Sequence, residues 1–461
     1  MSFYEPKFLL IFFPIFIIYL FIFRKKIFFK YGVIVFGLIF YSNGSIKLLE
    51  IIIFSCLMNY FLIKEIKFQK NFSKYYLLIN LFFNISFLFF HKVNPYENSI
   101  LPLAISFYTF QNIALAVDIY KNKNLEFKFS DYLNFILFFP QLISGPIARY
   151  SQLYNQTKLF KAPDSKTVAL GLSIFIIGLF KKVYIVNFLF DINQLQLDIL
   201  NNLEKIPLVD FYLFSSTYTF QIYYDFSAYS EMAVGLALIC GITLPWNFYS
   251  PLKASNMIEF WRNWHITLSN FFKDYVYIPL GGSRNGGLRK LFNLLIVFSI
   301  SGIWHGVGLN FLIWGFLNGF FVSINHLFMK FIDLKKIIGS RFLSIFFTFT
   351  IVSFIFNFFR FENLKDLQNI FMRITFRGFS NEIYYVTESF KNYYILIILF
   401  FVTFFFPNVK DLLINSRENI KFKKFITNYN LSTTIIFSII LYLFIIRISK
   451  VEMQQFLYYQ F

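Results

Sequence analysis

The tripeptide Trp304-His305-Gly306 places an imidazole inside an apolar run that extends from Leu291 to Met329. The chain has only four histidines in 461 residues. A titratable side chain near membrane depth costs roughly 3 kcal/mol or more, so a functional role is its default interpretation. Apolar surroundings favour the neutral imidazole, which can accept a proton from an attacking hydroxyl group. His305 is therefore our first candidate for a catalytic base.

Small residues surround His305 in the sequence. Ser301 and Gly302 precede it by about one helical turn, and Gly308 follows it. On one continuous helix these residues would share its face and would leave room for a substrate beside the ring. Close-packed interfaces between membrane helices use the same small residues. A histidine that only bonds a neighbouring helix is therefore the alternative.

A second histidine lies in an amphipathic segment upstream. Apolar residues recur at spacings of four and three between Met257 and Tyr275, which predicts one helix at the membrane interface or re-entering the membrane. His265 lies off its apolar side, near Arg262 and Ser269 by helical spacing. By residue type alone, His265 is either an interfacial polar residue or a second catalytic group.

A glycine-rich loop follows this segment. Gly281 and Gly282 would let backbone amides approach an anion, and Arg284 would add positive charge. A phosphate of a cytoplasmic donor is the ligand that such a loop would bind, with Trp264 as a further contact to the donor. A tight turn at the membrane surface explains the same glycines.

The composition predicts a polytopic membrane protein. Hydrophobic residues make up 57% of the chain, charged residues 15%, and the mean hydropathy is +0.59. Apolar stretches recur from end to end, which predicts an all-α protein with about eleven to thirteen transmembrane or re-entrant helices. The formal charge of +19 does not indicate nucleic-acid binding, because the basic residues cluster in short loops between the apolar stretches.

The distribution of charge predicts a topology. Basic loops, such as Arg284 to Lys290, are expected on the cytoplasmic side, and the acidic loop from Asp191 to Glu204 is expected outside. We expect an external amino terminus and no cleavable signal peptide. Cys56 and Cys240 are isolated in apolar runs, which favours core positions over a metal or redox site.

The distribution of polar and apolar residues along the chain suggests one integral membrane domain, residues 1–461, with three parts. Residues 1–100 carry few polar side chains and are expected to be scaffold helices. Residues 101–330 combine apolar runs with Gly, Pro, Asp, Gln, Arg and His, and are expected to be the catalytic core, since irregular backbone at membrane depth lines a cavity or lies buried in protein. Residues 331–461 are expected to supply further helices and an aromatic tail.

Several segments in fixed order resemble the membrane-bound O-acyltransferase (MBOAT) superfamily. The resemblance is strongest to the bacterial branch of alginate and peptidoglycan O-acetyltransferase membrane subunits. It spans roughly Leu101 to Trp314. The segments that carry it are Leu101–Gln111, Asp118–Tyr120, Phe139–Ile147, Tyr224–Ser227, Phe260–Ser269, Tyr277–Gly282 and Gly302–Gly306.

This resemblance implies a ring of helices around a central tunnel and an acyl donor, acetyl-coenzyme A, used without a metal or a bound cofactor. His305 matches the family's catalytic histidine, and His265 matches a second active-site histidine. The last six residues resemble a tail in which a tyrosine is a proposed acyl carrier, and Tyr458 matches that tyrosine. Anchoring of aromatic residues at the membrane interface is the alternative for the tail.

The function expected from this resemblance is O-acetylation of an envelope polysaccharide, peptidoglycan first and alginate or another exopolysaccharide second. The protein would lie in the bacterial inner membrane, among lipid, and pass acetyl groups to a periplasmic acetyltransferase partner. A transporter of polysaccharide intermediates is the competing class. Transporters commonly show internal repeats, and this chain shows none.

Overall fold

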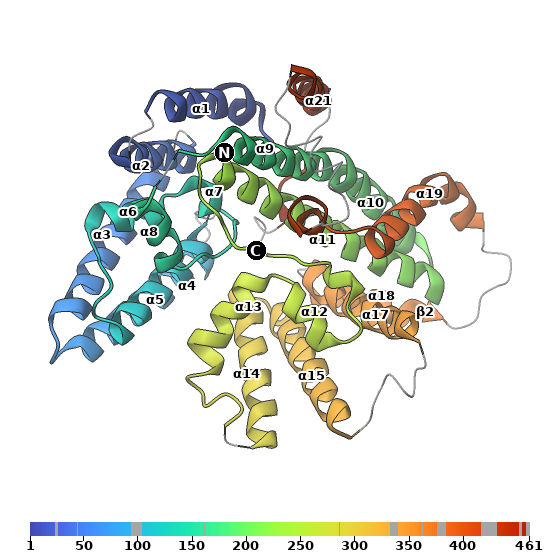
Figure 1. The fold of residues 1–461 in the computed structure, drawn as a ribbon. Helices are drawn as coiled ribbons and strands as arrows, with labels where there is room; N and C mark the ends of the chain where they lie inside the picture. The colour runs from blue at the N-terminus through green and yellow to red at the C-terminus, as the bar shows by residue number, and fades with distance from the viewer. Residues whose placement is uncertain are drawn as a thin grey trace. The chain divides into compact units, whose positions relative to one another are not determined.

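The chain folds almost entirely into helices, as Figure 1 shows. The computed structural model describes residues 1–23, 26–43, 45–93, 104–160, 162–284, 286–331, 340–361, 363–375, 384–415, 431–450 and 454–457. In these ranges the strands are β1 (Ile206–Pro207) and β2 (Ile374–Thr375), which pair in parallel. The predicted all-α class is confirmed.

Contacts along the chain define two compact units. One comprises residues 1–183, 227–246 and 413–460, and the other comprises residues 184–226 and 247–412 with residue 461. Helix α11 (Leu208–Ile239) contributes its first part to the second unit and the rest to the first. Both units are discontinuous in sequence and cross the boundaries of the three predicted parts. The single membrane domain and its division into three parts remain predictions.

The first unit contains the amino-terminal helices. These are η1 (Phe8–Phe12), α1 (Phe13–Ile22), α2 (Lys26–Ser42), α3 (Ile46–Phe68), α4 (Ser73–Val93), α5 (Ile105–Lys121), α6 (Phe129–Ile136), α7 (Phe139–Leu142), α8 (Tyr150–Lys158) and α9 (Ser165–Phe180), with α21 (Leu431–Lys450). Phe139 forms its aromatic centre, because the rings of Phe12 and Phe16 lie 5.2 and 4.9 Å away. Cys56 and Cys240 are buried in this unit, as expected.

The second unit contains the two candidate histidines. Its elements are α10 (Asn187–Asn202), η3 (Pro251–Lys253), α12 (Met257–Asn263), α13 (Ile266–Phe272), η4 (Lys273–Tyr277), α14 (Gly287–His305), α15 (Leu309–Phe331), α17 (Arg341–Arg360), α18 (Leu364–Arg373) and α19 (Tyr384–Phe405). The segments η2 (Lys181–Val186) and η5 (Asp411–Asn415) cross the boundaries between the units. The acidic stretch predicted as an external loop lies mostly in α10, whose buried side chains are half apolar and half amide-bearing.

Six helical stretches among the described residues are long and apolar enough to cross a membrane. They are Ile46–Phe68, Ser73–Val93, Ser165–Asn202, Gly287–His305, Leu309–Phe328 and Arg341–Arg360. Large apolar side chains on them face outward; Phe82, for example, is 74% exposed. Such surface is expected against lipid. The chain is therefore a multi-pass membrane protein, and the count of eleven to thirteen helices remains a prediction.

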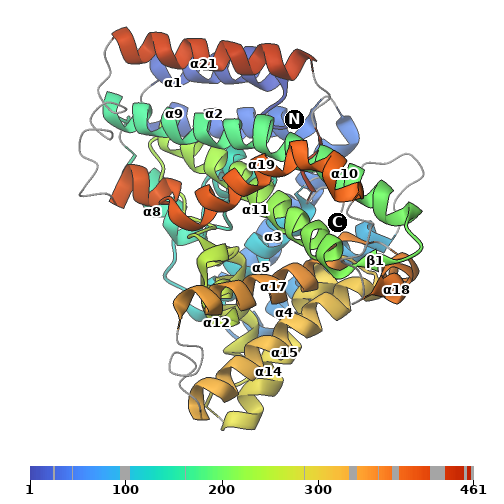
Figure 2. The same cartoon turned by 90° about the vertical axis from the view of Figure 1, so that its right-hand side faces the viewer.

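Helices α14 and α15 form an antiparallel hairpin, and both views show them side by side (Figures 1 and 2). Glycines allow this contact. A Cβ atom added at Gly302 would lie 2.2 Å from the carbonyl oxygen of Phe311, and one added at Gly315 would lie 2.3 Å from that of Phe298. Small residues let membrane helices pack backbone to backbone in this way.

Candidate active site

His305 is the last residue of α14 and is 4% exposed. The apolar run from Leu291 to Met329 is therefore not one span with the histidine at its centre, because the chain turns back after Gly306 to begin α15. The imidazole centroid lies 4.6 Å from the ring of Trp304, 5.0 Å from that of Trp314 and 5.2 Å from that of Phe359. Aromatic rings thus surround the candidate base and hold its orientation.

The small residues near His305 do not open a passage as expected. The side-chain space at Gly302 is filled by α15, and a Cβ atom added at Gly308 would lie 2.1 Å from Oδ1 of Asn310. Gly308 also lies in the turn, outside α14, so it does not share a helical face with the histidine. For these two glycines the close-packed alternative is correct. Ser301 does border a cavity, described below.

His265 does not lie on one continuous amphipathic helix, which corrects the sequence-based expectation. Helix α12 ends at Asn263 and α13 begins at Ile266. His265 itself has φ 41° and ψ 54°, in the left-handed region. This conformation costs about 1–2 kcal/mol for a residue other than glycine. The periodicity concealed the break because both short helices bury the same kind of residue.

The break at His265 is held by the preceding loop. The backbone oxygen of Asn247 accepts a hydrogen bond from the amide of Ile266 at 2.9 Å, and Oδ1 of Asn247 accepts one from Oγ1 of Thr267 at 2.6 Å. The His265 ring is 1% exposed and meets the ring of Phe226 edge-on at 4.6 Å. Burial lowers the pKa of His265 to about 3, so its imidazole is neutral at physiological pH. Strained, buried residues of this kind concentrate at functional sites.

A short path of aromatic contacts joins the two histidine regions. Trp264, the neighbour of His265, lies 5.3 Å from Phe356 between ring centroids. Phe356 in turn stacks on Trp314 at 6.5 Å, and Trp314 contacts His305. The tertiary structure therefore brings both candidate histidines to one aromatic cluster of the second unit.

A cavity of about 550 Å³ opens beside this cluster. Residues of α12, α13, η4, α14 and α15 line it, among them Trp261 and Ser301. The indole Nε1 of Trp261 donates to Oδ1 of Asn318 at 3.2 Å, and its ring lies 5.8 Å from that of Trp314. Because Ser301 precedes His305 by one helical turn, the cavity ends close to the candidate base.

The charge on the cavity wall is positive. Arg262, Lys273 and Lys290 line it, and none of its described lining residues is acidic. Lys273 lies 3.9 Å from Asp274 in an exposed pair, an interaction that contributes little in water. Nζ of Lys290 lies 3.0 Å from Nδ1 of His326. A cavity wall with three cations and no acidic residue among its described lining attracts phosphate or carboxylate groups.

Two of the residues predicted to contact the donor are placed differently from the expectation. Trp264 packs within the aromatic cluster and does not line the cavity, whereas Trp261 does. Arg284 is exposed and also lies outside the described lining. The sequence did not predict the positively charged cavity wall, although Arg262 lies on the polar face of the predicted segment Met257 to Tyr275. The other two cations come from separate elements, so no local spacing indicated them.

The glycine loop forms a tight turn. Gly281 and Gly282 have φ angles of 97° and 57°. Their amides donate to the carbonyl oxygens of Ile278 and Tyr277 at 3.0 and 2.9 Å. These donors are consumed within the turn, so they do not form the predicted anion cradle. Ser283, which follows them, lines the cavity instead.

The carboxy-terminal tail is anchored in the first unit. Phe456 is fully buried and stacks on Tyr229 at 4.9 Å. Phe3 stacks on the same tyrosine ring at 4.8 Å. The hydroxyl of Tyr4 donates to the carbonyl oxygen of Gln454 at 3.3 Å, so the two chain ends are held together. The candidate Tyr458 lies just beyond, outside the described residues.

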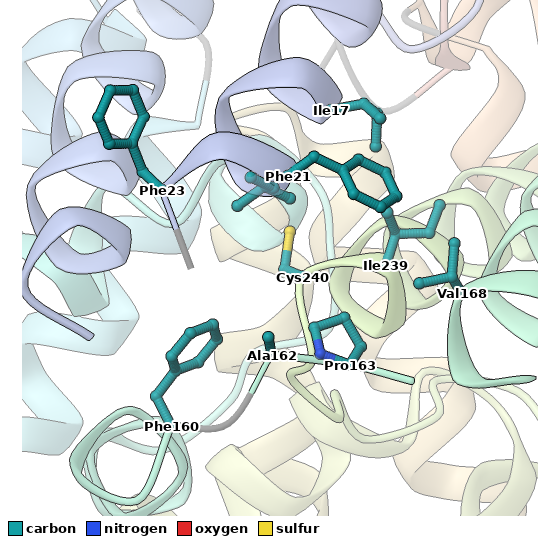
Figure 3. A pocket seen from close by; sticks show the side chains of 10 residues that line it. Ile17, Phe21, Phe23, Phe160, Ala162, Pro163, Val168, Ile239 and Cys240 are labelled. Carbon is teal, nitrogen blue, oxygen red and sulfur yellow. The ribbon is translucent and has the colours of Figure 1, made fainter. Parts of the chain in front are cut away.

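A second cavity belongs to the first unit and has a different character (Figure 3). It measures about 50 Å³. Its lining is apolar apart from the thiol of Cys240, with Phe21, Phe160 and Val168 on its walls. A cavity without charged or hydrogen-bonding side chains cannot carry the chemistry expected here. The cavity beside His305 is therefore the candidate active site.

Comparison with known proteins shows the family to which the chain belongs. Residues 126–363, just over half of the chain, match the sequence profile of the MBOAT, membrane-bound O-acyltransferase, family. The chain belongs to this family. The matched region contains both candidate histidines and the cationic cavity. The protein is therefore a membrane-bound acyltransferase, and the transporter class is not supported.

Two named relatives of this acyltransferase fall in the alginate and peptidoglycan O-acetyltransferase branch predicted from its motifs, and a third is named for D-alanyl transfer. A peptidoglycan O-acetyltransferase of Helicobacter pylori is 35% identical over 390 residues, which cover 74% of this chain and 73% of that protein. A probable alginate O-acetylase of Pseudomonas aeruginosa is 36% identical over 49% of this chain and 42% of that protein. A teichoic acid D-alanyltransferase of Bacillus subtilis is 30% identical over 51% of this chain and 62% of that protein.

Proposed function

We propose that this acyltransferase moves acetyl groups from cytoplasmic acetyl-coenzyme A across the membrane for O-acetylation of an envelope polysaccharide. The observation that carries the proposal is the cationic cavity, which ends one helical turn from the buried His305. Coenzyme A bears several phosphates, and Arg262, Lys273 and Lys290 would bind them at the open part of the cavity. The thioester would then lie at its inner end.

In this mechanism His305 acts as a general base. Its neutral imidazole accepts the proton of the attacking hydroxyl while the hydroxyl oxygen bonds to the thioester carbonyl carbon. The carbon–sulfur bond breaks, and the departing thiolate receives the proton from the imidazolium. The products are an acetate ester and free coenzyme A. The rings of Trp304, Trp314 and Phe359 orient the imidazole and exclude water from it.

We assign His265 a supporting role in this reaction. Its left-handed backbone and its bonded neighbours hold the ring in one place, and burial keeps it neutral. If it reaches the acceptor, this second neutral imidazole would orient the acceptor hydroxyl or share its proton.

Peptidoglycan is the acceptor we propose first. The Helicobacter relative, named for that polymer, is matched over 73% of its length, whereas the alginate relative is matched over 42%. Alginate or another exopolysaccharide is the second choice. In either case we place the protein in the bacterial inner membrane, where acetyl-coenzyme A is cytoplasmic and a periplasmic acetyltransferase partner would complete the transfer.

The decisive experiment is His305→Ala in the native host at unchanged protein level. We expect base-labile acetate on the envelope polymer to disappear, and its persistence would contradict the proposal. In a parallel assay with the purified protein, acetyl-coenzyme A should release coenzyme A when acceptor is added. Digestion of the polymer by a muramidase or an alginate lyase before acetate analysis identifies the acceptor.

We propose further that Tyr458 carries the acetyl group between the donor and the final sugar. The support is its position one residue after the described tail segment, which Phe456 anchors. Tyr458→Phe removes only the nucleophilic oxygen. We expect it to abolish acetylation of the polymer and any acetyl label on the protein, whereas full activity would reduce the tail to an anchor.

A further inference from the structure

Lys290 and His326 form a pair at the end of the α14–α15 hairpin that lies away from its turn, and both line the cationic cavity. Nζ of Lys290 lies 3.0 Å from Nδ1 of His326. A lysine ammonium group has three donors and no acceptor, so Nζ donates and Nδ1 accepts. The hydrogen bond at one ring nitrogen fixes the proton on the other. The imidazole of His326 therefore carries its proton on Nε2.

The Nε2–H group of His326 is left for a ligand. His326 is half-buried, and among the described residues its hydrogen-bond partner is Lys290. An N–H group that is polarised by an ammonium group at the opposite ring nitrogen is a strong donor and fits a negatively charged oxygen. Arg262 and Lys273 line the same cavity, and its described lining holds no carboxylate. A bound anion would therefore supply the acceptor that the cavity wall lacks.

The backbone around this pair is held in place by three helices. Oδ1 of Asn325 accepts a hydrogen bond from the amide of Met257 at 2.7 Å, which ties the end of α15 to the start of α12. A Cβ atom added at Gly319 would lie 3.1 Å from Cα of Leu295, so α14 and α15 pack closely within two turns of the pair. This packing fixes where the His326 ring lies relative to α14.

The cavity follows one face of α14 from the pair toward the candidate base. Its lining from that helix recurs at spacings of four and three, which place the side chains on a single stripe: Lys290, Leu294, Val297, Phe298 and Ser301. His305 continues this stripe four residues after Ser301. The helix rises by about 22 Å between Lys290 and His305. The pair and the base therefore lie at opposite ends of one helix face.

The order of chemical groups along this face matches that of coenzyme A. The middle of the face is apolar, between a cationic end and an imidazole end. Acetyl-coenzyme A has a thioester, then an uncharged pantetheine arm, then phosphates. The extended arm, from its sulfur to the first phosphate, is somewhat shorter than the rise of the helix, and the side chains of Lys290 and His305 span the remainder. A donor with its thioester at His305 would thus bring its first phosphate to the pair.

We propose that His326, oriented by Lys290, donates a hydrogen bond from Nε2 to the phosphate that ends the pantetheine arm of acetyl-coenzyme A. The pair thereby fixes that end of the donor and places the thioester beside His305. The ribose phosphate lies farther from the thioester and is not the group that His326 binds. The inference rests on the proposed function, because it takes acetyl-coenzyme A as the donor.

The test compares acetyl donors that differ in their phosphates, by initial rates of thiol release from purified protein with acceptor present. Acetyl-coenzyme A, its dephospho form and acetyl-phosphopantetheine all keep the phosphate at the end of the arm, whereas acetyl-pantetheine lacks it. In the wild type we expect kcat/KM for acetyl-phosphopantetheine to exceed that for acetyl-pantetheine at least about a hundredfold, because several charge-assisted hydrogen bonds are lost together.

His326→Met should lower this ratio about tenfold, because it removes one of those hydrogen bonds. The change should lie in KM, and it should be alike for the three donors that keep the phosphate. An unchanged ratio, or an equal rise in the KM of acetyl-pantetheine, would overturn the inference. A rise confined to acetyl-coenzyme A would assign His326 to the ribose phosphate and would overturn it as well.

Two further substitutions separate hydrogen-bond donation from packing. In His326→Gln the amide oxygen can accept from Lys290 while the amide nitrogen donates, so the ratio should stay within about threefold of the wild type. His326→Glu keeps an acceptor for Lys290 but presents a negative charge to the phosphate, so its ratio should fall below that of His326→Met. If His326→Gln behaves like His326→Met, donation is not the role of His326 and the inference fails.

Folding is monitored by the melting temperature of each variant in detergent. His91→Met, which removes a buried histidine from α4 in the other unit, is the matched control and should leave the ratio unchanged. If the wild type releases coenzyme A from acetyl-coenzyme A but His326→Met keeps the wild-type ratio, only the inference fails. If the wild type uses no acetyl thioester, the proposed function itself fails.

Discussion

Buried polar side chains occur in two regions of this acyltransferase, and their hydrogen bonding differs. Between α3 and α4, Asn59, Asn80 and Asn84 are fully buried and satisfy one another. Oδ1 of Asn59 accepts from Nδ2 of Asn80 at 2.8 Å and from that of Asn84 at 2.7 Å. Nδ2 of Asn59 donates to the carbonyl oxygen of Ser55 at 3.0 Å. This cluster joins two apolar helices and leaves little capacity for a ligand.

Around α10, α11 and α17 the polar groups retain unused capacity. In the described part of the chain, the amide of Gln196, Oδ1 of Asn357 and Oγ of Ser353 have no hydrogen-bond partner. Ser353 lines a cavity of about 350 Å³ between α11 and α17, whereas the asparagine cluster does not line any described cavity. A polar residue in an apolar helix therefore indicates a binding site only where its hydrogen bonds are not consumed by neighbours.

The largest expected effect distinguishes the proposed base, His305, from the asparagine cluster. His305→Gln should reduce acetyl transfer per folded protein by about 10²–10⁴, because the general base is lost. Asn84→Leu should leave transfer per folded protein within about twofold. Initial rates with purified protein, normalised to the folded fraction, measure both. An equal loss in the two variants would show that the two regions do not differ in function.

The cationic cavity provides the next largest effect. Replacement of Arg262, Lys273 and Lys290 together by Gln should raise the KM for acetyl-coenzyme A at least about tenfold, because charge-assisted hydrogen bonds to phosphate are lost. The dependence of KM on ionic strength should become flatter. The control is Arg289→Gln, because Arg289 is exposed, lies on α14 beside Lys290 and is not part of the described cavity lining. An unchanged KM would exclude the cavity as the donor site.

Acid sensitivity tests the buried second histidine. His265 lies outside the candidate spans, and burial lowers its pKa from 6.5 to about 3. Between pH 3 and pH 6.5 the His265 side chain binds more protons in the unfolded chain than in the folded protein. The neutral buried His265 therefore contributes its full stability above pH 6.5, and that stability is lost as the pH falls toward 3. His265→Asn tolerates the left-handed backbone and does not titrate. Its melting temperature should fall less steeply between pH 7 and pH 4.5; parallel curves would contradict this.

The smallest expected effect is structural. Asn59→Leu removes the central member of the asparagine cluster and leaves the amides of Asn80 and Asn84 without their main acceptor. We expect a loss of about 1 kcal/mol in stability, typical of hydrogen bonds between membrane helices. Thermal unfolding in detergent measures the loss. The control is Ser45→Ala, because Ser45 precedes α3 and its side chain makes no capping hydrogen bond. A ligand-dependent change in the loss would assign this cluster a binding role.

Local sequence patterns were enough to predict the helical class and the apolar spans and to select His305 as a candidate. Hydropathy reports on burial over tens of residues, and an imidazole in such a run is rare enough to stand out. Periodicity failed at His265, because Met257 to Asn263 and Ile266 to Phe272 continue the same apolar spacing across a left-handed break. The anchors of that break come from Asn247, which lies too far along the chain for a helical pattern to show.

The sequence alone determined that this protein is a helical membrane acyltransferase and singled out His305 as the candidate base, since residue type and order carry that information. Only the tertiary structure decided which partners meet. It made Gly281 and Gly282 a turn, moved Trp264 into the core, and placed Trp261 on the cavity wall. The cations of the cavity come from separate helices that converge on it. Such convergence depends on long-range packing, which no local spacing encodes.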